Sequence, residues 1–186
     1  MLMLVIAFAG RRIDAPDADV PRLPPASTDA VRERLRLLFA EHDADALVCA
    51  GACGSDLLAL DAAGTLGMRR RLVLPFDRTR FRATSVTDRA DELTDWGALF
   101  DEIVEGLPPD DVVELDGEAS GDEAYAVANR AILDEAEALA GDGSVRAVIA
   151  WEGTPRGEGD LTAAFAEEAR ARGIPAEEVR THPAVW

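Results

Sequence analysis

The stretch of residues 47–60 places the strongest limits on the fold. An apolar run ends at Gly51, a second glycine follows at Gly54, and apolar residues at helical spacing begin after Ser55 and Asp56. A buried strand that passes through a tight turn into a helix produces this pattern. The backbone amides at such a helix start, at the positive end of the helix dipole, suit a phosphate or a carboxylate. The stretch predicts a strand, turn and helix with an anion site, although Ser55 and Asp56 can also cap the helix without a ligand.

The rest of the chain repeats this alternation of strands and helices. Strands are expected at residues 2–9, 46–50, 71–74, 112–115 and 145–151, with a weak strand or coil at 174–180. Helices are expected from a cap at 27–29 and at 55–66, 95–105, 122–140 and 161–172, and irregular chain at 15–27 and 76–94. Strands that alternate with helices predict an α/β fold, Rossmann-like and doubly wound, with a mainly parallel sheet covered by helices on both faces. One domain over residues 1–186 is expected.

Charge and composition exclude several kinds of partner. The 186 residues include 19 basic and 36 acidic side chains, a net charge of −17, which repels nucleic acid and anionic membranes. The sequence contains no lysine, so arginines or backbone amides must meet any phosphate. No apolar run reaches the length of a membrane span. Cys49 and Cys53 are expected to be buried, reduced thiols, which favours a cytoplasmic protein.

The ends of the predicted strands should meet at one rim of the sheet, where ligands bind in such folds. After the first strand come Gly10, Arg11 and Asp14. The Arg11 guanidinium at this position can bind a phosphate through two hydrogen bonds; the alternative is that Arg11 is a surface arginine without a ligand. After the strand at 145–151, a glycine-rich loop precedes a helix and forms a second candidate phosphate loop, or a plain mobile loop. Its acidic residues suit ribose hydroxyls or a base edge better than a phosphate.

Other kinds of chemistry lack their residues. His42 and His182 fall outside the rim, which argues against a nucleophilic triad. The cysteines have no histidine or further cysteine partner, so no metal site is expected. The glycine turn lacks the third glycine and the acidic residue of a dinucleotide-binding fingerprint, so no nicotinamide or other cofactor is expected.

Several motifs, taken in order, resemble the SLOG superfamily, the Rossmann-like group of the DNA-processing protein A and LOG proteins. They lie at residues 9–14, 21–24, 51–58, 73–76 with 81 and 85–86, 129–132 and 157–162. The resemblance implies a Rossmann-like fold that binds a nucleotide or nucleotide derivative, and a homodimer. Together with the rim, it gives as candidate ligand-binding residues Gly10, Arg11, Asp14, Arg22, Gly51, Cys53, Gly54, Ser55, Asp56, Pro75, Phe76, Ser85, Asn129, Arg130, Glu152, Gly157, Gly159, Asp160 and Thr162.

One departure from the resemblance bears on catalysis. LOG hydrolases carry Pro-Gly-Gly-x-Gly-Thr-x-x-Glu, whereas residues 157–165 have no glutamate at that spacing. The sequence therefore favours a nucleotide-binding, sensor-type protein over an enzyme. The first alternative is a hydrolase of a nucleotide N-glycosidic bond, in which Glu152, Glu158 or Asp160 replaces the missing carboxylate. The second is a protein-interaction module that binds no nucleotide.

Overall fold

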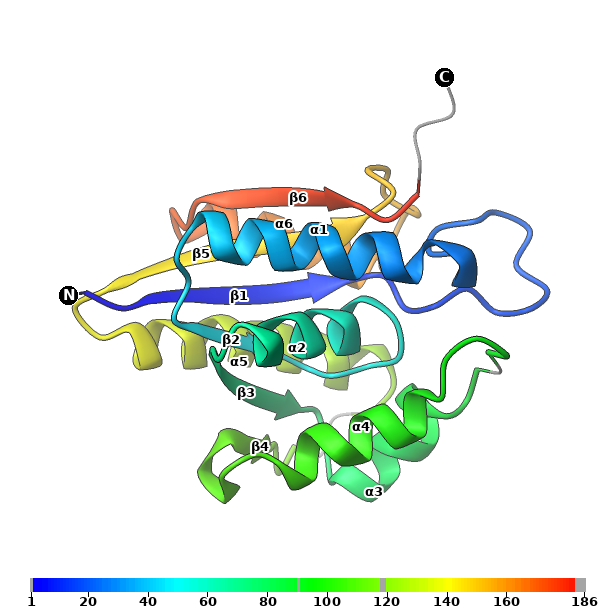
Figure 1. Ribbon diagram of the computed structural model, residues 1–186, viewed down its shortest axis with the longest axis horizontal. Helices are drawn as coiled ribbons and strands as arrows, with labels where there is room; N and C mark the ends of the chain where they lie inside the picture. The colour runs from blue at the N-terminus through cyan, green and yellow to red at the C-terminus, as the bar shows by residue number, and fades with distance from the viewer. Residues whose placement is uncertain (1, 90, 118–119, 183–186) are drawn as a thin grey trace.

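The computed structural model describes residues 2–89, 91–117 and 120–182. At its centre is a six-stranded sheet in which all neighbouring strands run parallel, in the order β4-β3-β2-β1-β5-β6 (Figure 1). The strands are β1 (Leu4–Gly10), β2 (Ala46–Cys49), β3 (Arg69–Leu74), β4 (Val112–Glu114), β5 (Ser144–Trp151) and β6 (Ala176–Arg180). The sheet confirms the predicted α/β class, and the expected weak strand near the end of the chain is β6, which pairs with β5.

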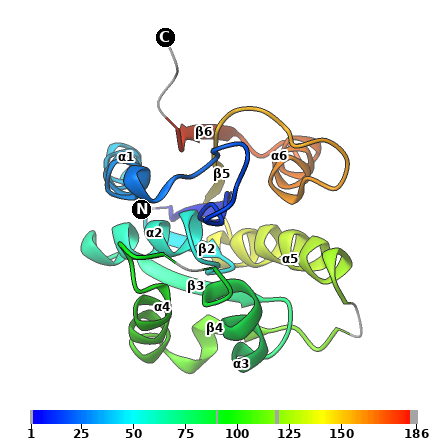
Figure 2. The same ribbon diagram turned by 90° about the vertical axis from the view of Figure 1, so that its right-hand side faces the viewer.

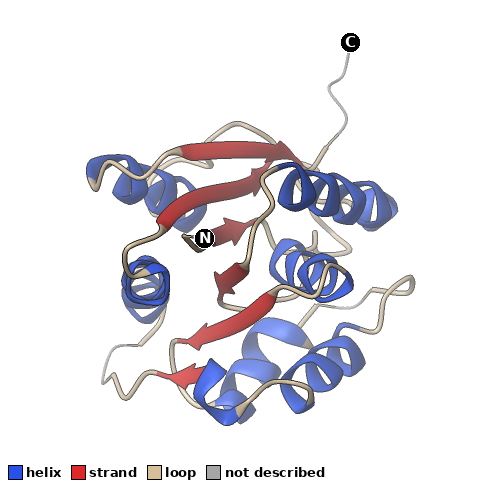
Figure 3. Cartoon of the chain, turned by 60° about the vertical axis from the view of Figure 1, so that its left-hand side comes forward, coloured by secondary structure: helices blue, strands red, loops and turns tan. Residues whose placement is uncertain are grey.

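Helices cover both faces of the sheet (Figure 3). Helices α1, α2 and α4 pack on one face, whereas α5 and α6 pack on the other (Figure 2). The α-helices are α1 (Thr28–Glu41), α2 (Ser55–Thr65), α3 (Arg78–Phe81), α4 (Trp96–Glu105), α5 (Asp122–Ala140) and α6 (Leu161–Ala171). A π-helical turn, η2 (Arg82–Val86), follows α3, and short 3₁₀ turns occur at η1 (Pro25–Ser27) and η3 (Pro109–Asp111). Among the described residues, no helix is both long and apolar enough to cross a membrane.

The central strand β1 shows why its sequence is apolar throughout. Ile6 and Phe8 belong to the core beneath α1 and α2, whereas Val5 and Ala7 belong to the core beneath α5 and α6. Successive side chains of a strand point to opposite faces, so a strand covered on both sides has no polar face. All four side chains are fully buried.

The segment at 76–94 corrects the sequence-based prediction. It was expected to be irregular, but it contains α3 and η2, and Ala90 lies outside the described residues. The Asp77 side chain accepts a hydrogen bond from the Arg80 amide and so caps α3. Phe81 and Val86 anchor the segment in the core. Together with Phe76 they are three buried apolar residues among many charged ones, and their spacing does not show the period of a helix.

The strand order creates a cleft at one end of the sheet. From β1 the chain adds strands on one side as far as β4, and α5 then carries it across to β5 on the other side of β1. The connections therefore diverge between β1 and β5, and ligands bind at such a divergence, beyond the carboxyl ends of the strands. Figure 2 looks onto this rim, with the loops after β1 and β5 facing the viewer.

Candidate functional site

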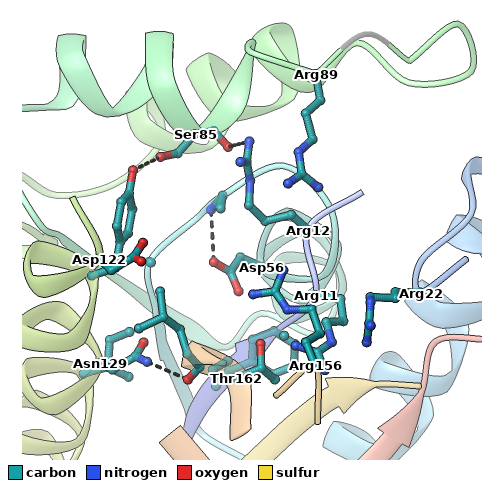
Figure 4. A pocket seen from close by; sticks show the side chains of 18 of the residues that line it. Arg11, Arg12, Arg22, Asp56, Ser85, Arg89, Asp122, Asn129, Arg156 and Thr162 are labelled. Carbon is teal, nitrogen blue, oxygen red and sulfur yellow. Dashed lines mark hydrogen bonds between the residues drawn. The ribbon is translucent and has the colours of Figure 1, made fainter. Parts of the chain in front are cut away.

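A cavity of about 280 Å³ opens at this rim (Figure 4). It lies between the ends of β1 and β2, the turn η2 and the starts of α5 and α6. Its lining residues are Phe8, Ala9, Gly10, Arg11, Arg12, Asp14, Arg22, Ala50, Ala52, Asp56, Phe81, Ser85, Arg89, Asp122, Tyr125, Asn129, Ile132, Arg156, Leu161 and Thr162. The volume is near the lower end of small-molecule sites, roughly 300–1,000 Å³.

The lining is rich in positive charge. It holds five arginines and three aspartates, although the whole chain carries a net charge of −17. Burial lowers the pKa of Arg89, and the positive charges of Arg12 and Arg156 lower it further. Among the described residues, the Arg156 guanidinium makes no hydrogen bond or ion pair. Arginine keeps its proton at any ordinary pH, so these guanidiniums repel one another and together favour an anion.

Arg12 is held at the cavity wall by its neighbours. Its Nη2 donates to the Ser85 carbonyl at 3.1 Å and contacts the Cys53 sulfur at 3.2 Å, and it pairs with the Asp88 carboxylate. Its Nε is buried and has no hydrogen-bond partner among the described residues. These contacts fix Arg12 in place, and none of them involves its Nη1.

Arg11, which was predicted to bind a phosphate, lines the cavity but has carboxylate partners within the protein. The side chain is 3% exposed, and it pairs with Glu152 and Asp160 at 2.7 Å each and donates to the Thr154 carbonyl at 3.0 Å. Its guanidinium also lies over the Trp151 ring, 5.7 Å from its centre. With two carboxylates on its donors, Arg11 ties the end of β1 to the loop after β5 and supplies no free charge to a ligand.

The expected phosphate cradle at the glycine turn is also occupied by the protein. The Gly51 and Ala52 amides donate to Asp56 Oδ2 at 3.2 and 3.0 Å. The Cys53 amide donates to the Ser85 carbonyl, and the Ser55 amide to the Arg11 carbonyl, both at 3.0 Å. These four amides have acceptors within the protein, so they are not free to bind a phosphate.

One wall of the cavity is apolar. Phe8, Phe81 and Ile132 are buried there, and Tyr125 packs edge-on against Phe76 with ring centres 5.9 Å apart. The Tyr125 and Ser85 hydroxyl oxygens are 2.6 Å apart, joining α5 to η2. A flat apolar wall beside a cluster of cations suits a ligand with a ring and a charged group.

Asp56 is a buried carboxylate at the floor of the cavity. Burial raises the pKa of Asp56 to about 6, while the Ala52 and Gly51 amides and the charge of Arg12 act in the opposite direction. An aspartate in the unfolded chain titrates near pH 3.9, so folding favours the protonated form. This contribution is therefore fully present below about pH 4 and is lost as the pH rises through about 6.

Asp56→Asn should accordingly be more stable than the wild type at pH 8, by up to about 3 kcal/mol. The asparagine carbonyl can still accept the two loop amides, whereas no charge is buried. The stability difference should shrink towards zero between pH 7 and pH 4. Urea unfolding of both proteins across this range measures it, and a difference that does not change with pH would contradict the assignment.

Eight of the predicted site residues line the cavity, and the others lie outside its lining, although some of these contact residues that line it. Those that line the cavity are Gly10, Arg11, Asp14, Arg22, Asp56, Ser85, Asn129 and Thr162. Those that do not are Gly51, Cys53, Gly54, Ser55, Pro75, Phe76, Arg130, Glu152, Gly157, Gly159 and Asp160. Two reasons are clear: Phe76 lies behind Tyr125, and Arg130 is exposed on α5.

Part of the glycine-rich loop after β5 faces a second groove. Gly157, Gly159 and Asp160 border it together with the start of α5. Asp160 also caps α6, accepting the Thr162 and Ala163 amides at 3.0 and 3.2 Å. Burial would raise the pKa of Asp160, but the hydrogen bonds from Arg11 and from backbone amides hold it well below the usual value.

Three arginines of the cavity were missed by the sequence analysis. Arg12 lies next to the predicted Arg11, and Arg156 lies within the predicted glycine-rich loop. The two loops that carry Arg12 and Arg156 were predicted to lie at the rim. A loop has no regular repeat, so its sequence does not indicate which side chains point into a cavity. Arg89 reaches the cavity from the segment after η2, where no sequence pattern indicates a binding residue.

The loop of residues 11–24 also reaches the cavity. Both Asp14 oxygens accept hydrogen bonds from the Arg22 amide, at 3.1 and 2.9 Å, and Oδ1 also accepts the Leu23 amide at 3.1 Å. The Arg22 guanidinium pairs with Glu152. Asp14 is therefore committed to shaping the loop, while Arg22 lies at the edge of the cavity beside a carboxylate.

Comparisons with known proteins identify the fold. No protein-family model matches the sequence, and no curated protein matches it. Among solved structures, DNA processing protein A from Streptococcus pneumoniae is similar, with a TM-score of 0.54 and 15% sequence identity. The match covers 99% of this chain and 51% of the other, so this chain spans about half the length of that protein. The chain therefore shares its fold with about half of DNA processing protein A, and the predicted Rossmann-like fold is confirmed.

Proposed function

We propose that this protein binds a small anionic ligand of the nucleotide class in the rim cavity. The observation that carries the proposal is the cluster of Arg12, Arg89 and Arg156 around a cavity at the divergence of the strands. Placing like charges close together costs free energy because they repel one another. A bound phosphate would relieve that repulsion and accept hydrogen bonds from several guanidiniums.

The other walls of the cavity suit the rest of such a ligand. The half-buried Tyr125 offers aromatic surface for a base, which has a flat face and polar edges, and the buried Phe81 adds to this apolar wall. Thr162 and Asp56 add polar groups on the remaining side. In this arrangement the phosphate faces the arginines and the base faces the aromatic wall.

Removing two of the arginines should weaken binding without unfolding the protein. In the double variant Arg89→Gln with Arg156→Gln, affinity for a nucleoside monophosphate is expected to fall at least tenfold, because two charged contacts to the phosphate disappear. Isothermal titration calorimetry with AMP, GMP, CMP and UMP measures this effect.

Arg36→Gln is the matched control for this experiment. Arg36 is an exposed arginine of α1, paired with Glu33 and outside the cavity, so its loss should leave affinity unchanged. Wild-type protein that binds none of the monophosphates, or a double variant that binds as tightly as the wild type, would contradict the proposal.

The hydrolase alternative has less support from the site. Two of its candidate carboxylates, Glu152 and Asp160, are paired with Arg11, and both Asp160 oxygens accept several hydrogen bonds. The third, Glu158, borders the second groove rather than the cavity. A carboxylate that must act on a ribose needs a free oxygen beside the ligand, and these three residues do not supply one there.

A further inference from the structure

The cavity contains a carboxylate oxygen that the protein leaves unused. Asp56 is 8% exposed, and its Oδ2 accepts the amides of Gly51 and Ala52. Its Oδ1 accepts no hydrogen bond from any of the described residues, although the side chain lines the cavity. Figure 4 shows Asp56 among the arginines with one oxygen bonded to the turn and the other directed into open space.

No cation of the protein pairs with this carboxylate within the described residues. Arg12 influences its charge from a distance, but the Arg12 donors contact Asp88, Ser85 and Cys53 instead. A nearly buried carboxylate without an ion pair is costly unless a donor reaches it. The most direct source of such a donor is the ligand, because the free oxygen faces the space that the ligand would occupy.

The donor must belong to a part of the ligand that is close to its anionic group. Asp56 repels a phosphate at its own position, yet it lies near enough to Arg12 to feel its charge. In a nucleoside phosphate the sugar hydroxyls adjoin the phosphate, whereas the amino group of the base lies one ring further away. A hydroxyl is also neutral, so it can approach the arginine cluster without repulsion.

We propose that Asp56 Oδ1 accepts a hydrogen bond from a sugar hydroxyl and thereby makes the cavity selective for a phosphorylated ribose over its deoxy form. This proposal rests on the proposed function, since it places the phosphate of the ligand at the arginines. It assigns the hydroxyl recognition to Asp56 in place of Glu152 and Asp160, which are engaged with Arg11.

Pairs of probes that differ by one hydroxyl test the proposal. Ribose 5-phosphate is compared with 2-deoxyribose 5-phosphate, and AMP with its 2′-deoxy and 3′-deoxy forms, by calorimetry at pH 8. Wild-type protein should bind the hydroxylated member of at least one pair about tenfold more tightly, the size expected for a hydrogen bond to a charged group. In Asp56→Asn that ratio should fall to about threefold or less, because the neutral amide forms a weaker hydrogen bond with a hydroxyl than the charged carboxylate does.

Two further variants separate this effect from a general loss of binding. Asp61→Asn removes a half-buried carboxylate of the same helix, which pairs with Arg32 outside the cavity, and it should keep the wild-type ratio. Arg89→Gln should weaken both members of a pair equally. Asp56→Ser, whose hydroxyl can accept the Ala52 amide, is the second variant if Asp56→Asn does not fold.

Several outcomes would overturn the proposal. A wild-type protein that binds both members of every pair equally has no hydroxyl recognition, and an Asp56→Asn protein that keeps the ratio places that recognition elsewhere. If Asp56→Asn changes the preference among bases but not among sugars, the donor belongs to the base. If no probe binds to the wild type, the proposed function fails as well, whereas phosphate-dependent binding without hydroxyl selectivity overturns this inference alone.

Discussion

Replacing Arg11 with methionine is expected to lower the free energy of unfolding by about 3–5 kcal/mol. Methionine keeps much of the apolar length of the side chain, but it leaves Glu152 and Asp160 without the guanidinium that neutralises them. Asp160 is almost fully buried, and Glu152 is largely so. A buried charge that loses its partner costs far more than an exposed ion pair contributes.

Urea unfolding at pH 7 measures the Arg11→Met effect, and Arg36→Met is the control. Arg36 also pairs with a glutamate, but on the solvent-facing side of α1. The urea midpoint of the Arg36→Met variant should therefore hardly differ from that of the wild type. Adding Glu152→Gln and Asp160→Asn to Arg11→Met should recover part of the loss, because the unpaired charges are then gone. An Arg11→Met protein as stable as the wild type would show that Arg11 is free to serve a ligand.

Gly54→Ala should destabilise the protein by about 3–5 kcal/mol, since it combines backbone strain with a collision. Gly54 has φ +107°, a region that side chains rarely allow. A Cβ at this position would lie 2.4 Å from the Ile13 amide nitrogen and 2.9 Å from the Arg11 carbonyl oxygen. Both neighbours are backbone atoms of the loop after β1, so neither can move aside as a side-chain tip would.

Gly157→Ala separates the two causes. Gly157 has nearly the same φ, +110°, but a Cβ there meets nothing within 4 Å. The control therefore carries strain alone and should lose clearly less stability than Gly54→Ala. Thermal unfolding of the three proteins side by side is sufficient, and equal losses for the two variants would mean that the collision with residues 11–13 does not occur.

The order of strands and helices could be predicted because burial on a doubly wound sheet leaves a plain pattern. Strand β1 is apolar on both faces, and α5 has the bounds that its helical period predicts, Asp122–Ala140. The segment containing α3 and η2 was missed since its fold depends on Phe81 and Val86 reaching a distant core. Contacts with residues that are distant in the sequence leave no regular spacing of apolar residues from which a helix could be predicted.

The location of the cavity could be predicted, but which of its polar groups are already bonded within the protein could not. Strand ends of a parallel sheet must converge, so the rim followed from the order of elements. Both Arg11 and Arg12 line the cavity, but the guanidinium of Arg11 is neutralised by Glu152 and Asp160, and these residues are more than a hundred positions away in the chain. In the same way, the amides of the glycine turn were assigned to a phosphate because the sequence does not reveal that Asp56 reaches back to them.

The loops around the cavity are joined to one another through their backbones. Arg12 forms a bridge with Gly54, the Ile13 amide donates to the Cys53 carbonyl, and the Cys53 amide donates to the Ser85 carbonyl. Backbone bonds of this kind do not depend on which side chains the loops carry. These backbone bonds of the frame therefore do not involve the side chains that would recognise a ligand. Exchanging Arg156, whose guanidinium makes no hydrogen bond or ion pair among the described residues, would change which molecule fits while this frame stays the same, which makes this rim a suitable starting point for designing new binding specificities.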